Sequence, residues 1–132
     1  MFSHIGKGLV VLVGVGHDET TEDLEWLTKK LVQLRIFDDE AGVMNRSVQD
    51  IEGDVMIVSQ FTLHALTKRG NRPSWIKAAP EEVSKPLYEA FVAKVEAALG
   101  RSVATGSFGA DMKIELINDG PVTIWIDSKN RE

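Results

Sequence analysis

Apolar residues along this chain of 132 residues recur with two spacings, one typical of strands and one typical of helices. Short apolar runs that are rich in β-branched residues and bounded by glycine or polar residues predict strands. Five segments fit this description, and the last two alternate apolar and polar side chains. The predicted strands are residues 9–15, 54–61, 102–105, 112–117 and 122–127.

A first helix is predicted from Thr20 onwards. Thr20 and Asp23 have the spacing of a capping box, in which the third residue of the helix reaches back to the residue that caps it. Four leucines between residues 24 and 34 then recur every three or four positions, while Lys29 and Lys30 face elsewhere. This pattern predicts an amphipathic helix with one buried face.

A second helix is predicted after Pro80, because proline and the acidic residues that follow it are favoured in a first helical turn. Pro86 is unfavourable inside a helix, so we expect the regular part to begin at Ser84. Gly100 stands where a C-terminal glycine ends a helix. The order strand, helix, strands, helix, strands predicts an α+β fold with a largely antiparallel or mixed sheet.

The length and composition indicate a single domain over residues 1–132, since domains commonly have roughly 100–150 residues. The chain has no cysteine, which excludes disulfides and thiolate metal sites and is compatible with a cytoplasmic location. No apolar run approaches the roughly 18 residues of a membrane span, and no signal peptide is recognisable. We therefore expect a cytoplasmic protein with no membrane partner.

The charge distribution leaves two interpretations open for one loop. A net charge of −5 argues against general nucleic-acid binding, which relies on Lys and Arg. The stretch between Asp54 and Glu81, however, contains no acidic residue, and it includes Lys68, Arg69 and Arg72. This basic loop is either a solvated surface loop or a surface that contacts phosphate groups.

Candidate chemistry is also ambiguous from the residues alone. The histidines lack the spacing of a zinc helix, and no serine has the GxSxG spacing of a hydrolase nucleophile. Ser59 and Gln60 follow the apolar residues 56–58 at the end of the second predicted strand. Either the strand runs out into solvent there, or these polar groups hold a carbonyl or a ribose. Gly120-Pro121 is either an ordinary turn or a specialised backbone feature, because a cis peptide before proline costs only about 0.5–1 kcal/mol.

Four motifs in this order resemble the D-aminoacyl-tRNA deacylases: SQFTL at residues 59–63, RGNRPS at 69–74, TGSFGADM at 105–112 and NDGPVT at 118–123. The resemblance extends from Ile5 to about Asp127. It implies a β-barrel-like sheet with two flanking helices, in a homodimer whose sites lie at the subunit interface. It also implies chiral proofreading, in which the ester between tRNA and a D-amino acid or glycine is hydrolysed without a cofactor or metal.

The resemblance assigns a chiral filter to Gly120 and Pro121. In the family, the carbonyl groups of this cis peptide reach into the active site of the other subunit and exclude the side chain of an L-amino acid. Asn118 and Thr123 are expected to hold the turn. A main-chain wall tests configuration without regard to which side chain is present, so selectivity would come from built-in clashes.

The resemblance also assigns the remaining site residues. Ser59 and Gln60 are expected to bind the terminal adenosine and the scissile ester, Phe61 to donate a backbone N–H to the carbonyl, and Thr62 to position the ester or act as nucleophile. The vicinal ribose hydroxyl of the substrate would assist hydrolysis. The adenine pocket is assigned to Phe108 and Met112, and tRNA contacts are assigned to Lys68, Arg69 and Arg72.

The N-terminal segment departs from the family pattern. Family members begin with a further strand or hairpin, whose arginine helps to lock the Gly-Pro turn, whereas here residues 1–4 lead almost directly into the first predicted strand. We therefore expect this element to be shortened or absent. Two alternatives stay open: a non-catalytic dimeric module that binds tRNA 3′ ends or nucleotides, and a related deacylase with a trans Gly-Pro peptide that accepts L-amino acids.

Overall fold

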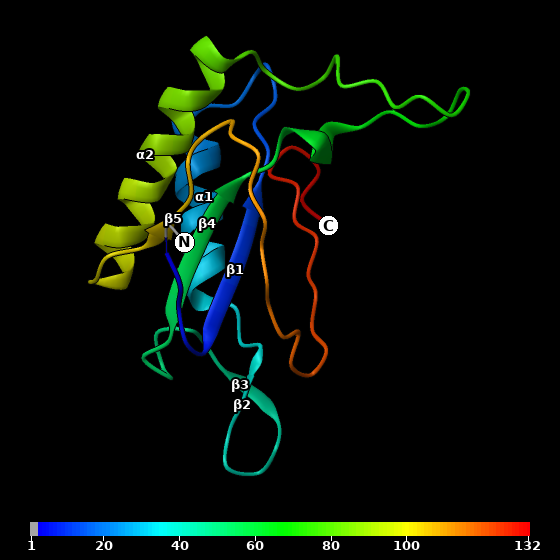
Figure 1. Ribbon diagram of the computed structural model, residues 1–132. Coiled ribbons are helices and arrows are strands. Elements are labelled where there is room, and N and C mark those ends of the chain that lie inside the picture. Colours follow the sequence, from blue (N-terminus) through cyan, green and yellow to red (C-terminus); the bar gives the residue numbers. More distant parts are fainter. Residues whose placement is uncertain (1–2) are drawn as a thin grey trace.

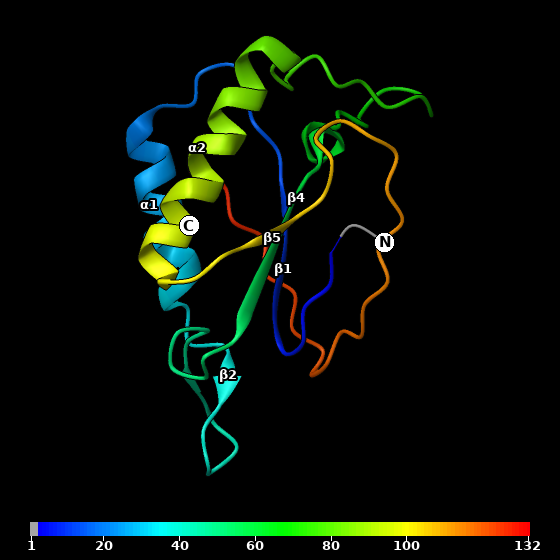
Figure 2. The ribbon, with the colours of Figure 1, turned by 60° about the vertical axis from the view of Figure 1, so that its left-hand side comes forward.

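A computed structural model describes residues 3–132, and its centre is a sheet of three parallel strands in the order β1-β4-β5 (Figure 1). The register runs from Gly8 opposite Asp54 to Val13 opposite Ser59. Helices α1 and α2 connect the strands and cover one face of the sheet (Figures 1 and 2). The elements are β1 (Gly8–Val13), α1 (Thr21–Gln33), β4 (Asp54–Ser59), α2 (Glu81–Leu99) and β5 (Ala104–Thr105).

Helix α1 begins as the sequence predicts. The Thr20 side chain accepts a hydrogen bond from the Asp23 backbone, and the Asp23 carboxylate accepts one from the Thr20 N–H at 2.9 Å. Leu24 and Leu31 are buried on the side of the helix that joins the core, while Lys29 is exposed. The capping box and the amphipathic pattern are both confirmed.

Helix α2 begins earlier than expected. Its first helical residue is Glu81, so the prediction that the regular helix starts at Ser84 is wrong. Pro86 lies in the second turn of α2 and is exposed. Because proline has no N–H, the Glu82 carbonyl loses its helical hydrogen-bond partner. Glu82 is exposed as well. Solvent can satisfy that carbonyl, so the helix tolerates the proline. The predicted C-terminal Gly100 is confirmed, with a left-handed φ of 79°.

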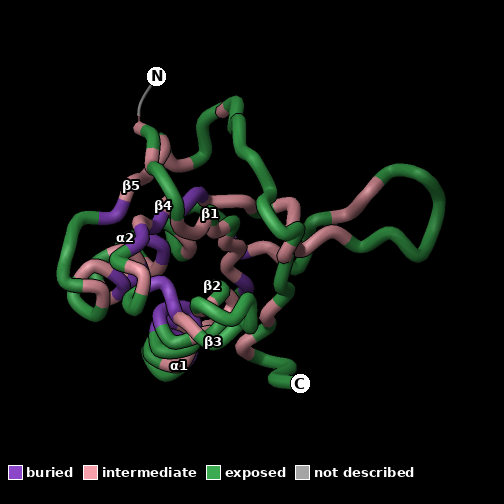
Figure 3. Tube along the Cα trace, turned by 90° about the horizontal axis from the view of Figure 1, so that it is seen from below, coloured by how far each residue is buried: buried purple, intermediate pink, exposed green. Residues whose placement is uncertain are grey.

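The core lies between the sheet and the two helices, as the burial colours in Figure 3 show. Val55 and Ile57 of β4 are fully buried, and they pack in one cluster with Phe91 and Val95 of α2. Burying an apolar side chain of this size contributes about 1.5–3 kcal/mol. This cluster fixes the position of β4, at whose C-terminal end Ser59 lies.

A hairpin and a short 3₁₀ helix complete the assigned elements. The hairpin consists of β2 (Phe37–Asp38) and β3 (Met44–Arg46), and the 3₁₀ helix η1 (Phe61–His64) follows the end of β4 after Gln60. The Asp39 carboxylate accepts hydrogen bonds from the backbone of Ala41 and Val43, so it stabilises a turn. Within residues 3–132, no group of three or more His, Cys, Asp or Glu residues is arranged to hold a metal ion.

The C-terminal segment differs from the prediction. Residues 112–127, here called the arm, form no strand, so the two strands predicted at 112–117 and 122–127 are wrong for this structure. The arm runs down and back along the side of the sheet away from the helices (Figures 1 and 2). An apolar–polar alternation forms a strand only where a neighbouring edge supplies hydrogen bonds. Among the described residues, the arm pairs with no strand edge.

The predicted α+β class with two flanking helices is confirmed. The sheet formed by the described residues is open and parallel, so the prediction of a largely antiparallel or mixed sheet is wrong for it; the antiparallel pair β2-β3 is a separate hairpin. Closure into a barrel-like sheet stays a prediction. In the described part of the chain, no helix is long and apolar enough to cross a membrane.

Candidate active site

A cleft of about 350 Å³ opens where β1 and β4 end. Its volume lies in the range typical of small-molecule sites, roughly 300–1,000 Å³, and ligands commonly bind at the carboxyl ends of parallel strands. Four segments line it: the ends of β1 and β4, the first half of α2, and residues 108–114. Five residues that the sequence singles out are among its lining residues: Ser59, Gln60, Phe61, Phe108 and Met112.

Ser59 and Gln60 lie half-buried at the edge of this cleft. The Gly109 N–H donates a long hydrogen bond of 3.5 Å to the Ser59 hydroxyl oxygen, and the Gln60 N–H donates to the Val13 carbonyl at 2.7 Å. The Gln60 side-chain amide donates to the Thr62 hydroxyl oxygen. Thr62 therefore contacts a cleft residue without being part of the cleft lining itself.

Phe61 is the first residue of η1 and is exposed over 57% of its surface. Its ring meets that of Trp75 edge-on, with the centroids 5.6 Å apart. The first N–H groups of a helix have no partner within the helix, so the Phe61 backbone N–H makes no hydrogen bond inside η1. The exposed ring and this N–H stand at the rim of the cleft.

Helix α2 contributes cleft residues that sequence reasoning did not assign to the site. The Tyr88 ring packs against that of Phe108 with the centroids 5.3 Å apart and the rings tilted by 56°. The Tyr88 hydroxyl donates to the Ile57 carbonyl at 2.9 Å. Burial raises the pKa of Tyr88, which keeps the hydroxyl protonated as a donor. Tyr88 stands three residues before the buried Phe91, so helical spacing could have identified it as inward-facing. Ser84 and Glu81 also line the cleft, and no sequence signal distinguishes them.

Met112 closes the cleft on the side of the arm. Its sulfur lies against Gly106, where an added Cβ would stand only 2.2 Å from that atom. Any side chain at residue 106 would therefore displace Met112. This close approach explains why glycine precedes the SFGADM part of the motif.

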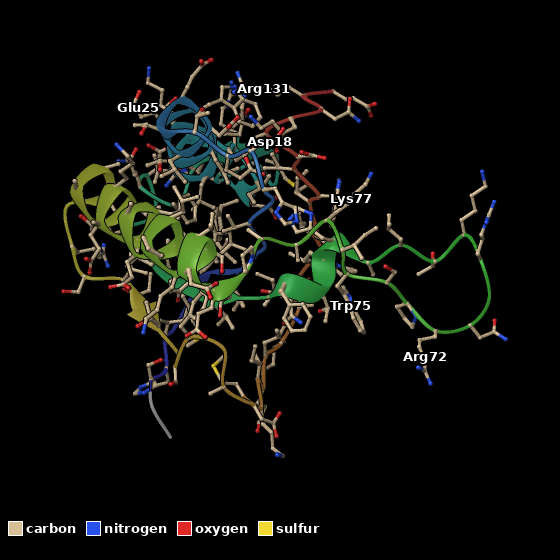
Figure 4. All side chains as sticks on the ribbon, turned by 90° about the horizontal axis from the view of Figure 1, so that it is seen from above. Asp18, Glu25, Arg72, Trp75, Lys77 and Arg131 are labelled. Atoms are coloured by element: carbon tan, nitrogen blue, oxygen red, sulfur yellow. The ribbon has the colours of Figure 1, made fainter. Side chains whose placement is uncertain are left out.

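The basic residues are separate from the cleft. Lys68, Arg69 and Arg72 are exposed in residues 67–73, here called the projecting loop, which leaves the body of the protein between Leu66 and Ser74 (Figure 4). Leu66 and Ser74 pair their backbones at the base of this loop, with hydrogen bonds of 2.7 and 3.0 Å.

The base of the projecting loop is hydrogen-bonded to the segment that follows β1. His17 Nε2 donates to the Ile76 carbonyl at 2.8 Å. This contact gives His17 a structural role. The loop residues beyond Leu66 extend into solvent (Figure 4).

The Gly120-Pro121 turn also lies outside the cleft. The peptide bond is cis, and the turn is closed by hydrogen bonds from Asn118 Nδ2 to Thr123 Oγ1 at 3.1 Å and from the Val122 N–H to Asn118 Oδ1 at 3.2 Å. The turn is exposed and lies at the end of the sheet opposite the cleft (Figure 1). Within one chain, these four predicted site residues do not meet Ser59.

The matched family model is described as D-Tyr-tRNA(Tyr) deacylase, and it aligns with residues 1–127. The chain belongs to this family. A relative from Parabacteroides distasonis named D-aminoacyl-tRNA deacylase is 63% identical over 130 residues, which cover 98% of this chain and 87% of that protein. The family resemblance inferred from the four motifs is thereby confirmed.

Two solved structures are similar in fold to this chain. The chain is similar to the c-Myc DNA Unwinding Element Binding Protein, with a TM-score of 0.85 and 37% identity over 91% of this chain and 81% of the other. It also shares its fold with a probable eukaryotic D-amino acid tRNA deacylase, with a TM-score of 0.63 and 24% identity over 73% of this chain and 56% of the other.

Proposed function

We propose that this chain hydrolyses the ester bond that joins a D-amino acid to tRNA. Membership of the family and the names of relatives that are 54–63% identical support this activity. The observation that carries the proposal for the site is the cleft itself, in which the SQF motif and the SFGADM motif meet although they are far apart in the sequence. The reaction adds water to the ester carbonyl, breaks its bond to the ribose oxygen, and releases the free amino acid and tRNA.

Each group of cleft residues is suited by its chemistry to a different part of the substrate. Phe108 offers an aromatic face next to Tyr88, which suits the stacking of the terminal adenine, and Met112 supplies an apolar wall. Ser59 and Gln60 offer a hydroxyl and an amide at the rim for the ribose and ester. The Phe61 N–H stabilises the negative charge that develops on the carbonyl oxygen.

Thr62 is a positioning residue in this proposal. Its hydroxyl accepts from the Gln60 amide, which orients that side chain at the cleft rim. The vicinal ribose hydroxyl of the substrate assists the attack of water, and the protein contributes orientation and hydrogen-bond donors.

Chiral selection is assigned to the main chain of Gly120 and Pro121 acting in a homodimer. The turn is exposed and lies far from the cleft of its own chain, so it can meet a cleft only in a second copy. A main-chain wall excludes the side chain of an L-amino acid, whereas a D-amino acid points its hydrogen at that wall. Glycine has no side chain to exclude, so glycyl-tRNA is also a substrate.

The projecting loop is assigned to the tRNA backbone. Lys68, Arg69 and Arg72 are exposed on an otherwise acidic protein, in an extended loop near the cleft end of the molecule (Figure 4). Replacing all three with Gln should weaken tRNA binding and flatten its dependence on salt. The substrate assigns the protein to the cytoplasm.

The deciding experiment measures deacylation of D-Tyr-tRNA, L-Tyr-tRNA and Gly-tRNA by the purified chain. Loss of the D-Tyr and Gly esters with the L-Tyr ester intact is expected. Gly120→Ala tests the filter, because Gly120 has a φ of 134° and an added Cβ would approach Val122 within 2.9 Å, displacing the turn. This variant should hydrolyse L-Tyr-tRNA measurably. An L-Tyr ester that is hydrolysed as fast as the D-Tyr ester by the unmodified chain would refute the filter.

A second candidate function is binding of nucleic acid without turnover. The similarity to a protein named for binding a DNA unwinding element, together with the projecting basic loop, favours it. Binding of uncharged tRNA or of a DNA duplex by a chain that leaves all three esters intact would support this candidate instead.

A further inference from the structure

The residues after the arm return to the N-terminal end of α1 and bind it at several points. Lys129 Nζ lies 2.8 Å from an Asp23 carboxylate oxygen, and Arg131 donates to the other oxygen at 3.5 Å. The Ser128 hydroxyl donates to the Glu19 carboxylate at 3.3 Å. We call these three contacts the C-terminal tether. Figure 4 shows Arg131 beside α1 at this end of the molecule.

Asp23 makes the tether stronger than an ordinary surface ion pair. Its side chain is only 7% exposed, whereas most surface pairs involve two solvated groups and contribute little. Burial raises the pKa of Asp23, but the hydrogen bonds from Lys129 and from the Thr20 backbone and hydroxyl outweigh burial and lower this pKa to about 2. A buried carboxylate that loses its cationic partner destabilises the folded state strongly. The ion pairs of Asp23 therefore keep the residues that follow the arm bound to α1.

Arg131 adds a second contact of a different kind. Its guanidinium carbon lies 4.5 Å from the centroid of the Trp26 ring, a distance typical of a cation–π interaction. The same side chain also lies 4.0 Å from the Glu22 carboxylate. Arg131 therefore contacts the first turn and a half of α1. These contacts fix both the position and the direction of the chain segment that carries Arg131.

The tether is also connected to the cleft through Glu19. The Glu19 carboxylate accepts from the Gly16 N–H at 3.3 Å as well as from Ser128. Gly16 forms a backbone bridge with Ala78, and the Val15 carbonyl accepts from the Ala79 N–H at 2.9 Å. Val15 and Ala79 both line the cleft. The tether and the cleft wall thus share one network of contacts.

The arm between these anchors has little else to hold it. Among the described residues, the hydrogen bonds made by residues 112–126 all lie within the Asn118–Thr123 turn. One end of the arm is fixed by Met112 against Gly106, and the other end is fixed by the tether. The path of the arm, and hence the place of the Gly120-Pro121 turn, depends on these two ends.

We propose that Lys129 and Arg131, held on Asp23 of α1, are positioning residues that set the place of the Gly120-Pro121 turn and so determine the selectivity for D-aminoacyl esters. This inference rests on the proposed function of the turn as a filter. It predicts that a loosened tether raises hydrolysis of the L-ester relative to the D-ester. A loss of stability alone would instead lower both rates together.

The test compares the unmodified chain with the double variant Lys129→Gln and Arg131→Gln. The measured quantity is the ratio of D-Tyr-tRNA to L-Tyr-tRNA deacylation rates, and it should fall about tenfold or more, since small misplacements at a site have large effects. Lys129→Arg with Arg131→Lys keeps both charges and should restore most of the ratio. Lys94→Gln removes a different ion pair with α1, the one to Glu25 at 3.6 Å, and should leave the ratio unchanged.

A second measurement does not depend on activity. Because the chain has no cysteine, spin labels can be attached at Asp119→Cys in the arm and Glu89→Cys on α2, both exposed positions. The distribution of distances between the labels should broaden in the double variant and stay unchanged in Lys94→Gln. An unaltered distribution together with an unaltered rate ratio would overturn the tether. If the unmodified chain hydrolyses neither ester, the proposed function fails, and the label distances still decide whether the tether positions the arm.

Discussion

The helix-covered face of the sheet and the arm are both rich in apolar side chains, but only those of the sheet are buried. In β4, Val55 and Ile57 are fully buried against α2. In the arm, Ile117 is 92% exposed and Trp125 is 69% exposed. The difference teaches that an apolar pattern identifies side chains suited to burial, whereas burial itself requires an opposing surface. For β4 the chain supplies this surface, and for the arm we propose that a second copy supplies it.

The largest expected contrast comes from truncating one side chain in each region. Phe91→Ala removes a side chain that is 99% buried, so it should lower the free energy of unfolding by about 3–5 kcal/mol. Ile117→Ala is the matched change in the arm and should cost less than about 0.5 kcal/mol in the isolated chain. Urea denaturation of both variants measures the difference. Equal losses would show that the arm is as well packed as the core.

The sequence could predict the first of these regions well and the second poorly. The capping box at Thr20, the apolar run of β4 and the glycine at residue 100 are local signals, and the structure agrees with each. The strands predicted in the arm depended on a partner edge that local patterns cannot specify. The start of α2 differs from the prediction for another reason: proline is unfavourable in a buried helix interior, whereas here the carbonyl that Pro86 leaves without a partner is open to solvent.

The candidate site divides in the same way. The motifs identified Ser59, Gln60, Phe61, Phe108 and Met112, which the fold brings to one cleft. Ser84 and Glu81 were missed because their inward direction depends on how α2 packs, which no short motif encodes. The Gly120-Pro121 turn was grouped with the cleft residues by resemblance, yet it lies at the opposite end of the sheet in a single chain.

The next largest effect on stability is expected at Asp23, where the C-terminal tether meets α1. Asp23 has a folded-state pKa of about 2 against an ordinary value of 3.8, which corresponds to about 2 kcal/mol of stability. Because the folded pKa is the lower one, this contribution is present above about pH 4 and is lost as the pH falls through about 2. The groups facing the carboxylate are Thr20, Lys129 and Arg131.

Asp23→Asn tests this pH dependence. The variant should be less stable than the unmodified chain by about 2 kcal/mol at pH 7, and the two stability curves should converge between pH 4 and pH 2. Denaturant titrations across this range measure the difference. A gap that stays constant down to pH 2 would contradict the role of the charged carboxylate.

A smaller effect is expected at the rear of the cleft. Tyr88→Phe removes the hydroxyl that donates to the Ile57 carbonyl at 2.9 Å and keeps the ring packed against Phe108. A hydrogen bond of this kind contributes about 0.5–1.5 kcal/mol, so stability should fall by about 1 kcal/mol. Thermal unfolding measures this loss of stability. Tyr88→Leu also removes the contact between the two aromatic rings, so it should lose more stability. An equal loss in both variants would show that the ring contributes nothing.

The smallest effect on the single chain should be the most informative about the arm. Ile117→Ser places a hydroxyl at a residue that is 92% exposed, so the free energy of unfolding of the monomer should change by less than about 0.5 kcal/mol. If a second copy covers the arm, the same change removes apolar area from that interface and weakens self-association. Sedimentation over a range of concentrations measures the dimer dissociation constant, with Lys113→Ser, also in the arm and exposed, as the control. Self-association that is unaffected by Ile117→Ser would place the interface elsewhere, and the exposed apolar side chains of the arm would then need a different partner.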